Sequence, residues 1–351
     1  MQGRKGLIIG LIALFVVILG VGGYYALVYF SGQSLKTKVD KMIAEMKEEV
    51  DVSYKSLTTK PFSLSVEMED VVLTPKDKTA KLKAKQVIVT GTSSGEPHSA
   101  LLKQIEIVPG EKDLDFPIRI DEVEISGVER RNGLTTKGVA FLRGLAIDAA
   151  TLKEKDRSEF KKILGGDKLL VNGQFVHDFQ PDKKELNNKL TITGTNLWEI
   201  SLAIRLGNVD AAKFSPENVK KTKDDVFALL ALVSELSVIH LELRYQDRSL
   251  VKNIINFIAE QQGQSADDFV QELLKQVDQG KELTGMLGAL PPEVEKSLHN
   301  GVDAVKKFLQ KPTGLKLSIA PAKPVVIASL IGAAGNPGKI LQQLNVSLTA
   351  D

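Results

Sequence analysis

The residues of this chain that could do chemistry are few, and they do not form a recognisable site. Glu295 and His299 are spaced to share one face of a helix, but two potential zinc ligands without a third do not hold a metal ion. Asp224 and Asp225 could act as a carboxylate pair, yet they precede an expected helix, where the helix dipole favours negative charge. Four histidines lie far apart in the sequence: His98, His177, His240 and His299. We therefore predict no metal-binding residues.

Motifs of covalent and phosphate chemistry are also absent from the sequence. The chain has no Cys, so it can offer neither a disulfide nor a thiolate nucleophile, and it contains no G-x-S-x-G elbow. The stretch 332–339 resembles a phosphate-binding loop, but the P-loop spacing needs Gly at Ala333 and Ser or Thr at Ile340. We therefore predict that the protein is not an enzyme and has no catalytic residues, no cofactor-binding residues and no cofactor.

The composition is that of a folded chain with no electrostatic preference for nucleic acid. Of 351 residues, 43% are hydrophobic and 26% are charged, which is enough apolar material for a buried core. Forty-six basic residues against 44 acidic residues leave a net charge of +2. Because nucleic-acid binding normally leaves a basic excess, we expect no nucleic-acid partner.

The strongest signal is an apolar segment near the N-terminus. Residues 6–30 contain no charged residue. At about 1.5 Å per residue, a helix of that length crosses the hydrocarbon core of a bilayer. The run is too long for a signal peptide and lacks an A-x-A-like cleavage site. We expect a retained transmembrane anchor over 6–30, preceded by a cytoplasmic tail over 1–5.

The charges beside this anchor do not fix its orientation by themselves. Arg4 and Lys5 precede the anchor, and more basic residues follow it: Lys36, Lys38, Lys41 and Lys47. A long following domain crosses the membrane largely regardless of such charges, and a short tail stays inside easily. We expect a single-pass protein with a cytoplasmic N-terminus and the bulk of the chain outside the cytoplasm.

The hydrophobic period then changes along the chain. Residues 31–51 are expected to form an amphipathic stalk helix, because apolar residues recur there at helical spacing. From 52 to 210 the period is two, as in antiparallel strands with one solvated face. The alternation slips at Glu69–Asp70 and at Asp121–Glu122, where the sequence predicts β-bulges.

Residues 211–351 are expected to form an α/β region. Its apolar spacing predicts three amphipathic helices over 249–262, 265–279 and 293–310, followed by closing strands over 315–319 and 344–348. The predicted fold class is therefore α+β. An N-terminal transmembrane helix precedes a largely antiparallel sheet that could curve, and a C-terminal helical portion packs on that sheet.

This pattern is similar to that of the AsmA-like and YdgA-type bacterial proteins. The resemblance is carried by strands that end in Thr/Ser-Gly and by one longer stretch: 87–91 (VIVTG), 123–127 (VEISG), 190–194 (LTITG) and 241–247 (LELRYQD). It implies a bacterial inner-membrane protein whose bulk faces the periplasm. It also implies a curved sheet whose apolar concave face can hold lipid acyl chains, in envelope lipid homeostasis or outer-membrane assembly.

Two hypotheses for function follow. The first is a membrane-anchored periplasmic lipid-binding or lipid-handling domain with phospholipid as its partner. Its candidate apolar groove is formed by alternate residues of two strands: Phe62, Leu64, Val66, Met68, Ile200, Leu202, Ile204 and Leu206. The second is a non-enzymatic scaffold or assembly subunit that binds other envelope proteins. The two hypotheses use the same apolar strand faces, so the sequence does not separate them.

Overall fold

The structure is a computed structural model that describes residues 37, 40, 41, 43, 44, 50–60, 64–76, 80–92, 97–109, 117–131, 134–210, 212–214, 225–283 and 290–351. Over these residues the chain is α+β, with long antiparallel strands and several helices, as the sequence predicts. The expected anchor at 6–30 and most of the expected stalk at 31–51 lie outside the described residues. Among the helices that are described, none is long and apolar enough to cross a membrane.

The chain forms two compact units. Unit 1 comprises the described residues up to 154 together with 168–177, and unit 2 comprises the described residues of 155–167 and 178–351. Strand β8 (Lys168–Gln180) therefore begins in unit 1 and ends in unit 2.

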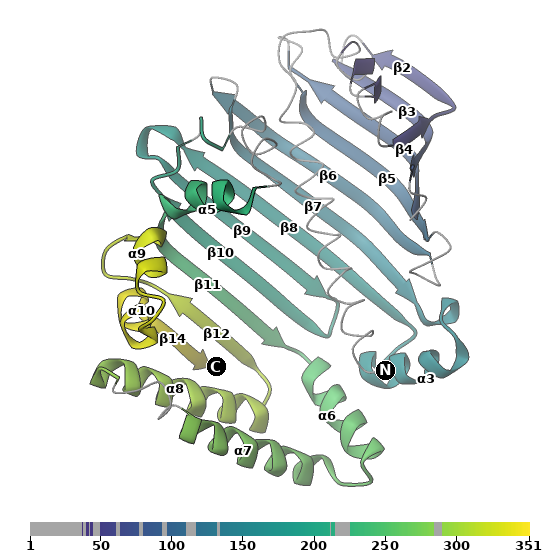
Figure 1. Ribbon diagram of the computed structural model, residues 1–351. Helices are drawn as coiled ribbons and strands as arrows, with labels where there is room; N and C mark the ends of the chain where they lie inside the picture. The colour runs from purple at the N-terminus through teal and green to yellow at the C-terminus, as the bar shows by residue number, and fades with distance from the viewer. Residues whose placement is uncertain are drawn as a thin grey trace. The chain divides into compact units, whose positions relative to one another are not determined.

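Unit 1 is built on an antiparallel sheet (Figure 1). Its strands are β1 (Val50–Ser53), β2 (Ser56–Lys60), β3 (Ser65–Pro75), β4 (Ala80–Gly91), β5 (Pro97–Pro109), β6 (Ile118–Arg131), β7 (Leu134–Asp148) and the first part of β8. The order is β1-β3-β4-β5-β6-β7-β8, and β2 also pairs with β3. The short helix η2 (Ala149–Thr151) follows β7 and is capped by the Asp148 carboxylate, which accepts a hydrogen bond from the Ala150 amide at 2.8 Å.

The two faces of this sheet differ in chemistry. On one face, alternate residues of successive strands are buried and apolar, such as Val66, Ile105 and Ile125. On the other face, charged side chains pair across the strands. Glu106 accepts from Lys83 at 3.1 Å, and Arg143 lies 2.8 Å from Glu124. The alternation read from the sequence thus corresponds to a sheet with one apolar face and one solvated face.

One row of residues crosses the sheet where the alternation changes phase. The residue pairs along neighbouring strands place one residue of each strand in this row. From β3 to β7 these residues are Asp70, Lys85, Gln104, Asp121 and Gly144. Three of these residues, on alternate strands, have left-handed backbone: Asp70, Gln104 and Gly144. At this row, successive buried residues lie three positions apart instead of two: Met68 and Val71, Ala84 and Val87, Ile120 and Val123, and Leu142 and Leu145.

The two phase slips predicted from the sequence both fall on this row. The alternation between buried and exposed residues does change phase there. The pairing between neighbouring strands stays in register, because the change occurs at the same row in each strand. No strand needs an extra residue relative to its neighbour, so the predicted β-bulges are wrong in mechanism although right in place.

Unit 2 combines antiparallel strands with most of the described helices (Figure 1). Its strands are the end of β8, β9 (Glu185–Gly194), β10 (Trp198–Gly207), β11 (Ser237–Asp247), β12 (Gly314–Ile319), β13 (Val325–Val326) and β14 (Val346–Ala350). Its helices are α3 (Glu154–Leu164, from residue 155), η3 (Pro181–Lys183), α5 (Val226–Ser234), α6 (Leu250–Gln261), α7 (Ala266–Leu283), α8 (Pro292–Gln310), α9 (Ile327–Gly332) and α10 (Pro337–Leu344). The strand order is β8-β9-β10-β11-β12-β14, with β13 on β11.

Within each unit the strands lie side by side in an uncurled sheet (Figure 1), so the curvature implied by the resemblance is not observed. Curling requires repeated bulges or a steady stagger between strands. Here the β9–β10 and β3–β4 pairings show no shift in register, and the shifts in the β4–β5, β6–β7 and β10–β11 pairings fall near strand ends. The three long amphipathic helices expected from the sequence are present as α6, α7 and α8.

Candidate functional site: an apolar sheet face and its cavity

The sheet of unit 2 carries three rows of apolar side chains on one face. The central row is formed by residues directly opposite one another on β9, β10, β11, β12 and β14: Leu190, Leu202, Leu243, Leu317 and Leu348. The flanking rows contain Ile192, Ile200, Tyr245, Leu315 and Ala350 on one side, and Ile204, Leu241, Ile319 and Val346 on the other. Because opposite residues of an antiparallel pair project to the same side, these rows form one continuous apolar face.

The other face of the same sheet is polar. Arg205 pairs with Glu185 at 2.7 Å, and Lys316 lies 3.0 Å from Glu242. Arg244 reaches the carboxylate of Asp351 at 3.2 Å. Ion pairs of this kind mark a solvated face, so the apolar rows define the side of the sheet that needs cover or a ligand.

The C-terminal end of the apolar face opens into a cavity of about 350 Å³. Its lining comes from α7, α8, α10, β12 and β14 and comprises Val277, Val294, Ser297, Leu298, Gly301, Val302, Val305, Leu317, Leu341, Val346 and Leu348. Leu317 and Leu348 belong to the central leucine row. The cavity is therefore the covered end of a face whose central row is only partly buried on β9 to β11, where Leu243 is 39% exposed.

Helix α8 forms the main wall of this cavity because of its sequence spacing. Val294, Leu298, Val302 and Val305 recur at intervals of three and four and therefore share one side of the helix. Gly301 lies on the same side, where an added Cβ would stand in ordinary van der Waals contact with Leu348 of β14, at 3.6 Å. Outside the cavity, Lys306 of α8 pairs with Asp278 of α7 at 2.6 Å and ties the two helices together.

The cavity offers a ligand almost no hydrogen-bonding chemistry. Ser297 is its one polar lining side chain among the described residues, and its hydroxyl already donates to the Val346 carbonyl at 2.5 Å. A polar ligand group placed there would lose its water and could gain at most a hydrogen bond to the Ser297 oxygen. The site is therefore suited to a hydrocarbon chain. Within the described ranges, no group of three His, Asp or Glu residues could hold a metal ion.

A polar contact beside the site supports the packing of α8. The ring of Tyr245 meets that of Phe308 edge to face at a centroid distance of 5.9 Å, and its hydroxyl donates to Asp247 at 2.6 Å. The same Asp247 oxygen accepts from the Val251 amide at 2.9 Å, at the start of α6. Burial, and secondly the hydrogen bond to Asp247, raise the pKa of Tyr245 above its usual value.

This raised pKa predicts a loss of stability at alkaline pH. The folded protein holds the Tyr245 proton at pH values where the unfolded chain, with a pKa of about 10, has released it. The stabilisation that the neutral Tyr245 side chain gives the folded state is complete below about pH 10 and falls as the pH rises further. We expect Tyr245→Phe to cost about 0.5–1.5 kcal/mol at neutral pH through the lost hydrogen bond, and to reduce the alkaline loss. Urea unfolding followed by Trp198 fluorescence measures both; equal alkaline loss in the two proteins would contradict this.

The residues predicted from the sequence for an apolar groove fall in both units. Phe62 lies outside the described residues, Leu64 is an exposed turn residue with left-handed backbone, and Val66 and Met68 are buried in unit 1. The other four are half-buried on β10: Ile200, Leu202, Ile204 and Leu206. Three of these belong to the apolar rows that lead to the cavity. Leu206 packs instead against the core cluster of Phe179, Val209 and Leu236.

None of the cavity-lining residues was singled out from the sequence as a ligand-binding residue. The apolar stripe of α8 is visible in the sequence, but the same stripe is expected of any helix packed on a sheet. Only the structure shows that the stripe, the leucine row and Leu341 enclose a space together.

A comparison with protein families finds a model, described as an uncharacterized protein, that matches residues 191–351. The match covers less than half of the chain, but it includes every residue that lines the cavity. None of the curated proteins that were compared matches the chain.

Proposed function

We propose that the protein is a membrane-anchored lipid-binding protein that holds a lipid acyl chain on the apolar face of unit 2. The observation that carries the proposal is the leucine row that runs from half-buried β11 into the cavity beneath α8. A lipid has the matching chemistry, because its acyl chain needs no hydrogen bonds while its headgroup needs to stay in water.

The dimensions of the site agree with this proposal. A volume of about 350 Å³ falls within the range of roughly 300–1,000 Å³ for ligand pockets. The cavity joins an apolar surface that is already partly exposed at Leu243, so a chain could enter along the sheet without unfolding any strand. Each methylene removed from water contributes about 0.8 kcal/mol, which gives a long acyl chain a large gain on binding.

The location that we propose follows the sequence. Residues 6–30 would anchor the chain in a bacterial inner membrane, with the N-terminus in the cytoplasm and the two units in the periplasm. An anchor of this kind would keep the lipid site close to its source of ligand, in a role in envelope homeostasis.

The test is to fill the cavity without disturbing the helix surface. We expect Val302→Phe to lower the lipid recovered from the purified full chain by about tenfold, equivalent to about 1.4 kcal/mol of binding. Stability should change by less than about 1.5 kcal/mol, because the phenyl ring enters existing space. Purification from membranes in mild detergent, solvent extraction and mass spectrometry measure the lipid.

The matched control is Asn300→Phe, which adds the same ring to an exposed position of the same helix. It should retain the lipid of the wild-type protein. Equal lipid recovery from both variants and wild type, or no lipid in any of them, would reject lipid binding at this cavity. Stoichiometric recovery of another envelope protein, without lipid, would favour a scaffold instead.

A further inference from the structure

A second apolar surface of unit 2 lies on α5, β13 and α9, away from the cavity lining. Four large side chains on these elements are unusually exposed: Phe227 at 82%, Leu230 at 46%, Val326 at 41% and Ile331 at 44%. A soluble surface rarely gathers several such side chains on adjacent elements. We call these four residues the α5–α9 patch.

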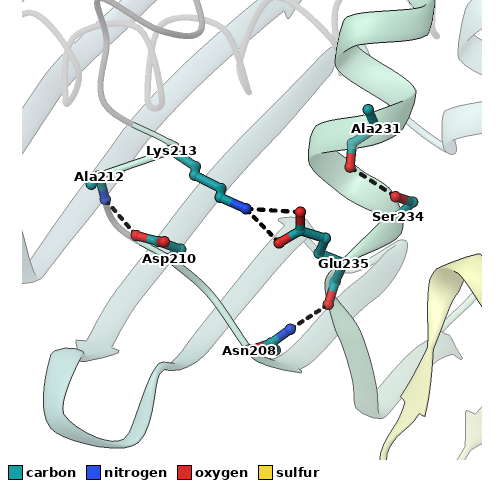
Figure 2. A network of polar contacts seen from close by, with 7 residues as sticks. All are labelled: Asn208, Asp210, Ala212, Lys213, Ala231, Ser234 and Glu235. Atoms are coloured by element: carbon teal, nitrogen blue, oxygen red, sulfur yellow. Dashed lines mark hydrogen bonds and ion pairs between the residues drawn. The ribbon is translucent and has the colours of Figure 1, made fainter.

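Polar contacts hold helix α5 at both of its ends. The Asp225 carboxylate caps the N-terminus and accepts from the Phe227 and Ala228 amides at 2.9 and 3.0 Å. At the other end, Lys213 donates to both oxygens of Glu235 at 2.8 and 2.6 Å (Figure 2).

A second contact supports this C-terminal end. Asn208 donates to the Glu235 carbonyl at 2.7 Å, and the Ser234 hydroxyl donates to the Ala231 carbonyl at 2.8 Å (Figure 2). The helix is therefore tied to the turn that follows β10. The helix that carries the exposed apolar side chains is therefore held in place at both ends.

The two helices of the patch lie together because they share a core. Val233 of α5 and Ile327 of α9 both pack against the cluster of Phe179, Val209 and Leu236. The Ile327 amide also donates to the Leu236 carbonyl at 2.9 Å. Figure 1 shows α5 and α9 at the same end of the strands of this unit. The exposed side chains of the patch therefore come from neighbouring elements of this unit.

The charged residues nearest β13 and α9 in the sequence are basic. The sequence from 304 to 350 contains no Asp or Glu, and the exposed residues Lys323 and Lys339 flank β13 and α9 within it. Neither lysine has an ion-pair partner among the described residues. At the ends of α5, the described acids are hydrogen-bonded, Asp225 to the first helical amides and Glu235 to Lys213.

We propose that the α5–α9 patch inserts into the interface of a bilayer that contains anionic lipid. From Val226 to Val233 every side chain of α5 is apolar, so its outer surface offers no side-chain hydrogen bond. A protein partner normally makes about one hydrogen bond per 100–200 Å² of interface, whereas a bilayer interior requires none. Lys323 and Lys339 complement anionic headgroups at the rim. The inference does not depend on ligand binding in the cavity.

The absence of Cys from the chain allows a direct test by single-cysteine spin labelling. Full-length Phe227→Cys and Ile331→Cys are labelled with a nitroxide and reconstituted into vesicles of phosphatidylcholine with phosphatidylglycerol. We expect both labels to be more accessible to oxygen than to a water-soluble nickel chelate, at a depth of about 5–10 Å. Leu170→Cys, at a position 39% exposed on β8 in unit 1, is the control and should stay accessible to nickel.

The charge contribution is tested in the same proteins. Adding Lys323→Glu and Lys339→Glu should move both labels towards water, as should vesicles of phosphatidylcholine alone. Labels at 227 and 331 that match the control in nickel accessibility would overturn the proposal. Shielding from both reagents, or spectral broadening from a second copy of the label, would also overturn it, because each indicates a protein contact in place of lipid.

Discussion

Replacement of Gly144 by Ala is expected to destabilise unit 1 by about 2–5 kcal/mol. Gly144 has φ +66°, a conformation that costs an L-residue about 1–2 kcal/mol. An added Cβ would also overlap the side chain of Asp121, which lies opposite on β6. Relief of that overlap must move the exposed Asp121 side chain and, because the Asp121 Cβ would also lie at 3.0 Å, the strand that carries it, which costs about 1–3 kcal/mol more. Hydrogen exchange of β6 and β7 amides at increasing urea concentration measures the loss.

The chain offers a matched control at Gly127 on β6. Its φ is +63°, nearly the same, but no atom stands within 4 Å of the position of an added Cβ. Gly127→Ala should therefore show the backbone cost alone, about 1–2 kcal/mol. Adding Asp121→Ala to Gly144→Ala should recover the difference. If Gly144→Ala and Gly127→Ala have equal effects, the overlap with Asp121 plays no part.

The phase change at this row shows which part of the fold the sequence could predict. The slips at Glu69–Asp70 and Asp121–Glu122 are visible because alternation is a local property of each strand. Their alignment across β3 to β7 depends on register, which is set by pairing between residues far apart in sequence. The same local pattern therefore suggested separate bulges where the structure has a single row.

The helices of unit 2 show the same division between local and distant information. The expected helices at 249–262 and 293–310 match α6 and α8 closely, because apolar spacing is a local property of the sequence. Helix α10 was not predicted, although Asn336 before Pro337 is a start signal: its side chain accepts from the Lys339 amide at 3.0 Å. Its short length hid the apolar period.

The candidate site needed the structure because its walls come from distant segments. Strand β10 was identified from its alternation, and Leu202 does lie in the central row. The cavity, however, is completed by Leu317, Leu341 and Leu348, which follow Leu202 by more than a hundred residues. Taken alone, each of these leucines is typical of a core position, so the sequence contains no pattern that predicts them as one site.

Leu202→Asp is expected to remove bound lipid while leaving unit 2 folded. Leu202 lies between Leu190 and Leu243 in the central row and is half-buried, so a carboxylate there can stay partly hydrated when the face is empty. We expect the free energy of unfolding to fall by about 1–3 kcal/mol, mainly through lost apolar burial. A bound acyl chain would strip water from the charge, which is far more costly. Lipid recovered from the purified chain should therefore drop sharply.

The matched control for this substitution is Ser201→Asp. Ser201 precedes Leu202 on the same strand but projects to the polar face, where Arg244 lies directly opposite and can receive the new charge. It should change neither lipid content nor unfolding, both measured as for Leu202→Asp, with Trp198 of β10 as the fluorescent reporter. Global unfolding by Leu202→Asp, with no lipid in the wild-type protein, would instead show that the leucine row is packed core and would leave the scaffold as the better function.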